Sequence, residues 1–114
     1  HLPTARERLV EAGVRLVEEL VCHPLYRRVL DVDPELLLPL VVDRFGSTQQ
    51  AAIDVVAEQV EEGQRDGSIR AIDPRLAATC LQLTAQSFVF SARVVEGQDV
   101  LPELRRLLDS YLRP

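Results

Sequence analysis

Lysine and methionine are absent from this chain of 114 residues, and cysteine occurs only twice. All 13 basic residues are therefore arginines, which suggests a GC-rich coding sequence rather than a function. Because the chain opens on His1 without a methionine, we expect a piece of a longer protein and set His1 aside as a candidate tag remnant. Cys22 and Cys80 form no CxxC pair, and there is no signal peptide, so we expect reduced thiols in the cytoplasm.

The motifs of common enzyme classes are also missing. The sequence has no GxSxG, no glycine-rich phosphate loop and no HExxH. His23 is the only internal histidine, and its neighbour Cys22 would point about 100° away from it on a helix, so the two cannot chelate one ion. The pairs Glu18–Glu19 and Glu61–Glu62 are typical of solvated charge. We therefore predict no catalytic activity, no metal site and no cofactor.

Positive charge and long apolar runs are both scarce. The net charge is −5 and the pI is near 5.0, the wrong sign for a surface that neutralises phosphates. We therefore do not expect this segment by itself to bind nucleic acid. The longest apolar run, around residues 36–42, is far shorter than the roughly 18 residues of a membrane span.

Helical periodicity dominates the chain, no segment alternates convincingly with period two, and the length fits one domain over residues 1–114. We predict an all-α fold with helices over residues 4–22, 25–30, 33–44, 47–66, 73–96 and 99–112. Four starts carry cap signals: capping-box spacing at Thr4–Glu7 and Ser47–Gln50, and an N-cap before proline at Asp33–Pro34 and Asp73–Pro74.

Glycine and proline predict where these helices end or bend. Gly46 is expected to end the third helix and Gly67 the fourth, while Pro39 is expected to kink the third. In the first helix the expected buried face is a leucine stripe widened by valines: Leu9, Leu16 and Leu20 with Val10, Val14, Val17 and Val21. In the fourth it is Ile53, Val56 and Val60.

The segment over residues 73–96 is expected to be the longest helix and is apolar nearly all round. A helix with so narrow a polar face must be covered on two sides. Cys80, Thr84, Ser87 and Ser91 lie on its mostly apolar side, where hydroxyls can bond to the preceding turn or can orient a small ligand in an apolar pocket. His23, Tyr26 and Phe45 lie near predicted breaks between helices, where a pocket mouth or ordinary core packing would both fit.

The run from Val60 to Phe90, VEEGQRDGSIRAIDPRLAATCLQLTAQSFVF, resembles the C-terminal domain of the TetR family of bacterial transcriptional regulators. The residues that carry the likeness are a glycine-rich turn and an Asp-Pro helix start: Glu62, Gly63, Gly67, Ile69, Asp73, Pro74, Ala77 and Ala78. The closing run RVVEGQDVLPELRRLLDSYLRP is similar to the final helix of that family. The resemblance implies a domain that senses a ligand and forms dimers, with DNA bound by an N-terminal helix-turn-helix that this chain lacks.

In that family the last two helices of each subunit pack against those of the partner as a four-helix bundle. The resemblance implies a homodimer interface with the candidates Leu83, Phe90, Val94, Leu104, Leu108 and Tyr111. The alternative is that these residues are buried within one chain.

The resemblance also implies a pocket among the middle helices and the penultimate one, for a small apolar or aromatic effector. Its candidate lining residues are His23, Tyr26, Phe45, Val56, Thr84, Ser87 and Phe88. The effector would act by population shift, altering the spacing of the two DNA-reading units. A second hypothesis is a self-contained helical interaction module that binds a partner protein and no small molecule.

Overall fold

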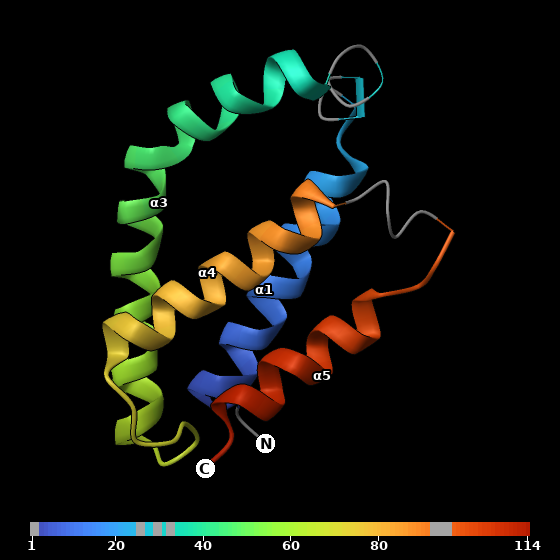
Figure 1. Ribbon diagram of the computed structural model, residues 1–114. Coiled ribbons are helices and arrows are strands. Elements are labelled where there is room, and N and C mark those ends of the chain that lie inside the picture. The colour runs from blue at the N-terminus through green and yellow to red at the C-terminus, as the bar shows by residue number, and fades with distance from the viewer. Residues whose placement is uncertain (1–2, 25–26, 29–30, 32–33, 92–96) are drawn as a thin grey trace.

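The computed structural model describes residues 3–24, 27–28, 31, 34–91 and 97–114; over residues 34–48 it describes the backbone alone. Within these ranges there are four principal helices and no strand, so the all-α prediction is confirmed (Figure 1). The helices are α1 (Ala5–Cys22), α3 (Pro34–Arg65), α4 (Pro74–Phe90) and α5 (Leu101–Leu112).

Helix α1 begins at the predicted cap and buries a narrower part of the predicted apolar face. The Thr4 hydroxyl accepts a hydrogen bond from the Glu7 backbone N–H at 3.2 Å. The buried stripe consists of valines, Val10, Val14 and Val17, whereas Leu16 is 50% exposed and Leu20 is 37% exposed. The predicted face is therefore confirmed for its valines and for Leu9, which pack in or against the core, and is wrong for Leu16 and Leu20 at its edge.

Helix α3 corrects the prediction of two separate helices. Its 32 residues run without a break through Gly46 and Ser47. A glycine inside a helix costs only about 1 kcal/mol, too little to end it unless a competing cap forms. Figure 1 shows α3 as one bent helix whose first half arches over the top of the molecule, while its second half runs beside α4. The kink at Pro39 stays a prediction.

Helix α4 begins at its predicted cap, where the Asp73 carboxylate accepts from the Leu76 backbone N–H at 3.0 Å and Pro74 follows. It spans 17 residues and ends at Phe90, so α3 is the longest helix that the structure describes. The predicted end near Glu96, the cap at Asp33 and most of the short helix over 25–30 lie outside the described residues.

Helix α1 is the centre of the packing, since α3, α4 and α5 all contact it. On α3 the predicted stripe is confirmed: Ile53 and Val60 are buried, and Val56 packs against the same cluster. The buried core combines side chains from all four helices and the turn after α3: Val10, Val14, Val17, Val60, Ile69, Ala77, Leu81, Val89, Leu104, Leu108 and Leu112.

A polar clamp closes the end of the molecule where both termini lie (Figure 1). The Ala5 N–H donates to the Asp66 carboxylate at 2.9 Å, which ties the start of α1 to the turn after α3. Arg6 donates to the Ser68 carbonyl at 2.9 Å, and its Nε lies 3.0 Å from the Asp109 carboxylate of α5. Three elements distant in sequence are thereby joined at this end.

Arg70 adds a second link between the loop before α4 and the end of α5. Its backbone N–H donates to the Leu112 carbonyl at 2.9 Å and its Nε–H to the Tyr111 carbonyl at 2.8 Å. These bonds use carbonyls at the C-terminal end of α5, where a helix leaves acceptors without intrahelical partners.

The turn after α3 depends on two glycines. Gly67 has a φ of +83°, which L-residues with a side chain rarely adopt. Gly63 is fully packed, and a Cβ there would come within 2.2 Å of the buried Ile69 side chain. At Gly13 of α1, by contrast, a Cβ would meet only the end of Leu108 at 3.2 Å.

We therefore expect Gly63→Ala to lower the free energy of unfolding by about 1–3 kcal/mol, because Ile69 must move within a packed core. The matched variant Gly13→Ala should stay within about 1 kcal/mol of the wild type, since its helix propensity improves. Urea denaturation measures both. Equal midpoints for the two variants would contradict the packing at Gly63.

The clamp also predicts a pH dependence. The hydrogen bond from Arg113 to Asp109, at 2.7 Å, together with the nearby Arg6 charge, lowers the pKa of Asp109 below its ordinary value of 3.8. A carboxylate with a lowered native pKa contributes stability above its ordinary pKa, and this contribution is lost as the pH falls through the native value. We expect Asp109→Asn to be less stable than the wild type at pH 7, with the difference shrinking below about pH 4. Denaturation at a series of pH values tests this, and a difference independent of pH would contradict it.

Candidate functional site

Helix α4 has two apolar sides, as the sequence predicts. Ala77, Ala78 and Leu81 are buried against the core, whereas Leu76 is 55% exposed and Leu83 is 58% exposed. At 100° per residue, positions 76, 83 and 90 fall on one stripe that points away from the core. A helix with a buried apolar side and an exposed apolar side has surface left for another partner.

Helix α5 extends this exposed surface through Tyr111. Burial and the nearby Cys80 thiol raise the pKa of Tyr111, and the Arg70 guanidinium lies 4.8 Å from the centre of its ring. The tyrosine therefore lies close to Cys80, which lies between Leu76 and Leu83 in the sequence of α4. Leu107, one turn before it, is 53% exposed. We call this surface the outer face; it consists of Leu76, Leu83, Phe90, Leu107 and Tyr111.

The structure separates the candidate dimer residues into two groups. Leu83 is exposed, and Phe90 and Tyr111 are half-buried on the outer face. Leu104 is 0% exposed and Leu108 is 5% exposed. Both are therefore buried in the core of their own chain. Val94 lies outside the described residues.

The other side of α4 borders a cavity of about 130 Å³. The cavity lies between α1 and α4. Val56 of α3 and two leucines of α5, Leu108 and Leu112, also line it. Eleven residues line it, and none of them is charged: Leu9, Val10, Ala12, Gly13, Leu16, Val56, Leu81, Gln82, Ala85, Leu108 and Leu112. Small side chains at Ala12, Gly13 and Ala85 leave the space between the two helices. This is the candidate ligand site.

The candidate pocket residues whose side chains the structure describes lie at different places. Val56 lines the cavity beside Gln82, whereas Phe88 borders a second cavity of about 190 Å³ near the end of α1. The Thr84 hydroxyl donates to the Cys80 carbonyl at 2.8 Å, as expected of a hydroxyl that bonds to the preceding turn. Ser87 and His23 are both exposed.

Two candidates fall outside what the structure describes: Tyr26 altogether, and Phe45 in its side chain. The pocket residues predicted from the sequence are mostly aromatic or carry hydroxyl groups, and they do not include Gly13, Ala85 or Gln82. A glycine inside an amphipathic helix was the available signal, because glycine is unfavourable there unless space is needed.

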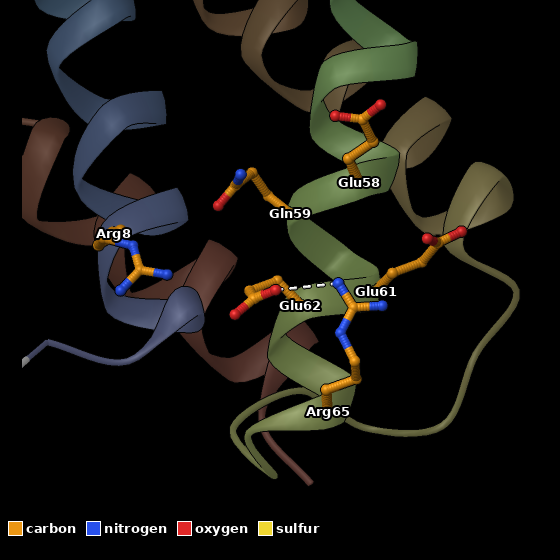
Figure 2. A pocket seen from close by; sticks show the side chains of 6 residues that line it. All are labelled: Arg8, Glu58, Gln59, Glu61, Glu62 and Arg65. Carbon is orange, nitrogen blue, oxygen red and sulfur yellow. Dashed lines mark hydrogen bonds and ion pairs between the residues drawn. The ribbon is translucent and has the colours of Figure 1, made fainter.

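A charged hollow of about 520 Å³ lies between α1 and α3 (Figure 2). Figure 2 shows Gln59 and Glu62 of α3 extending toward the side of Arg8 on α1, while Glu58 and Glu61 point away from it. The one ion pair drawn, Arg65 to Glu62 at 2.9 Å, joins exposed groups three residues apart. Such pairs contribute about 0–1 kcal/mol, so this surface fits the prediction of solvated charge.

No helix in the described part of the chain is long and apolar enough to cross a membrane. No cluster of three or more histidine, cysteine, aspartate or glutamate side chains there could hold a metal ion.

Similarity to known proteins supports a role in transcription. Proteins named HTH-type transcriptional regulators, two from strains of Mycobacterium tuberculosis and one from Mycobacterium bovis, are each 33% identical over 111 residues. The alignment covers 94% of this chain, but the chain spans only 58% of the length of these relatives. The chain is similar to transcriptional regulators. No protein-family model matches it, and no solved structure does.

The burial of Leu104 can be tested directly. We expect Leu104→Ala to lose about 2–5 kcal/mol of stability, because a fully buried leucine leaves a cavity in the core. Leu16→Ala, the same change at a leucine that is 50% exposed, should cost less than about 1 kcal/mol. Chemical denaturation of both variants is the measurement, and similar losses would contradict the observed burial.

Proposed function

We propose that this chain is the dimerising, effector-binding part of a TetR-like transcriptional regulator. DNA would be bound by a helix-turn-helix outside this chain. The named relatives support regulation of transcription, and the net charge of −5 argues against phosphate binding by this segment itself.

The observation that carries the proposal is the outer face. Leu76 and Leu83 on α4 and Leu107 on α5 are each more than half exposed, and both helices pack against α1. Monomeric soluble proteins rarely expose large contiguous apolar patches, and such patches mark interaction sites. In a two-fold dimer the same patch on both copies would pack together, so that α4 and α5 of each copy form a four-helix bundle. A stable interface of this kind buries about 1,600 Å² in total.

Helix α4 would connect ligand binding to dimer geometry. One side of it borders the cavity through Gln82 and Ala85, and the opposite side carries Leu76 and Leu83. An effector that prefers one position of α4 would shift the population of dimer arrangements, and one with equal affinity for both would change nothing. Operator half-sites lie about 34–36 Å apart, so a shift of a few ångströms at the DNA-reading units would change DNA affinity.

The same exposed face favours one other function, a helical module that binds a different protein. In that case α4 and α5 would contact a partner of another sequence, and the isolated chain would be monomeric. The solution mass therefore distinguishes the two.

We expect light scattering to give about twice the chain mass of 12.8 kDa for the wild type. Leu83→Asp should give a folded monomer, because the interface would bury a charge without a partner. Leu83 is exposed within the chain, so this substitution spares the core.

The matched control is Val55→Asp. Val55 is 61% exposed on the side of α3 that faces away from the core, so a charge there should leave the dimer intact. A monomeric wild type, or a dimer that survives Leu83→Asp, would contradict the proposed interface.

A further inference from the structure

The cavity between α1 and α4 is lined almost entirely by apolar residues. Ten of its eleven lining residues have apolar side chains or none, and the exception is Gln82 of α4. Among the residues that the structure describes, no carboxylate, guanidinium or imidazole borders it. Gln82 is half-buried, and none of the described residues makes a hydrogen bond with its side chain.

We propose that this cavity binds a neutral organic molecule of about one ring that carries one hydrogen-bonding group, and that the Gln82 carboxamide is the partner of that group. The inference rests on the proposed function, because it names the effector class for the regulatory domain. It assigns specificity to a residue on the helix that also carries the outer face.

The size of the cavity sets the size of the ligand. Its volume is about 130 Å³. An enclosed apolar cavity of about 150 Å³ holds benzene, so a single ring is the scale of this volume. The space here opens to solvent beside Ala12 and Leu16, which are both exposed. A larger side chain at Ala12, Gly13 or Ala85 would occupy the same space, so these three positions keep the cavity open.

The lining residues determine which charge the ligand can carry. An ionised ligand would leave water for a surface without a counter-charge, which is strongly unfavourable. A ligand without any polar group would leave the Gln82 amide, which has two donors and an acceptor, facing an apolar molecule. A neutral ligand with one hydroxyl or carbonyl avoids both costs, because a hydrogen bond gains strength in apolar surroundings.

Phenol and toluene are matched probes, since they have equal numbers of heavy atoms and differ in one hydroxyl. We would measure the Kd of each for the full chain by NMR titration of its methyl resonances. We expect both to bind the wild type and to shift methyl groups of Leu9, Leu81 and Leu108. In Gln82→Leu the preference for phenol over toluene should fall about three- to tenfold, the effect of one lost hydrogen bond.

Gln86→Leu is the control at a half-buried glutamine one turn later that does not line the cavity. The preference of Gln86→Leu for phenol over toluene should equal that of the wild type. Ala85→Leu should weaken both probes at least tenfold by filling the space. Ala12→Leu should also fill the cavity, from an exposed position on α1. This variant is used instead if Ala85→Leu does not fold.

Each outcome decides the inference. Loss of the phenol preference in Gln82→Leu alone supports it, together with weaker binding in the filled variant. An unchanged preference, an equal change in Gln86→Leu, or a wild type that binds neither probe at millimolar concentration overturns it.

Failure of the proposed function gives a different result. If the probes bind as expected but the chain is monomeric by light scattering, the cavity assignment stands and the dimerising regulator does not. If the chain is a dimer that Leu83→Asp dissociates, yet neither probe binds, dimerisation stands and the ligand class is wrong.

Discussion

One helix, α1, supplies the surface on which the other three helices pack, and the rest of the structure depends on this constraint. Its buried stripe is narrow and consists of small β-branched side chains, Val10, Val14 and Val17. Helices α3, α4 and α5 all contact α1, and α4 also packs extensively against α3, so that one apolar side of α4 is buried. The other side, with Leu76 and Leu83, stays exposed. The outer face therefore includes the apolar side of α4 that does not take part in the core.

The polar clamp, at the end of the molecule where both termini lie, holds three parts of the chain together. Bonds from Ala5, Arg6 and Arg70 join the start of α1, the turn after α3 and the end of α5. The candidate cavity lies farther along α1, where Gly13 faces α5 and Ala85 of α4. The cavity and the clamp are thus at different places along α1.

The helix starts were predictable because a cap is a local interaction. Thr4 and Asp73 each accept a hydrogen bond from a backbone N–H three residues later, so sequence spacing alone identifies them. The break at Gly46 was not predictable in the same way. A glycine followed by a serine fits both a helix end and a helix interior, and α3 continues through the pair. The candidate pocket residues were scattered because a cavity is defined by what small side chains leave empty, which no single residue type signals.

The sequence by itself determined the all-helical architecture, the caps, the acidic charge and the presence of too much apolar surface on the segment that forms α4. These properties depend on composition and on periodicity within one helix. Only the tertiary structure decided which apolar side is buried, as Leu104 and Leu108 inside the core and Leu16 and Leu83 outside it show. The reason is that helical periodicity defines the faces of a helix, whereas burial depends on which face meets a neighbouring helix that is distant in sequence.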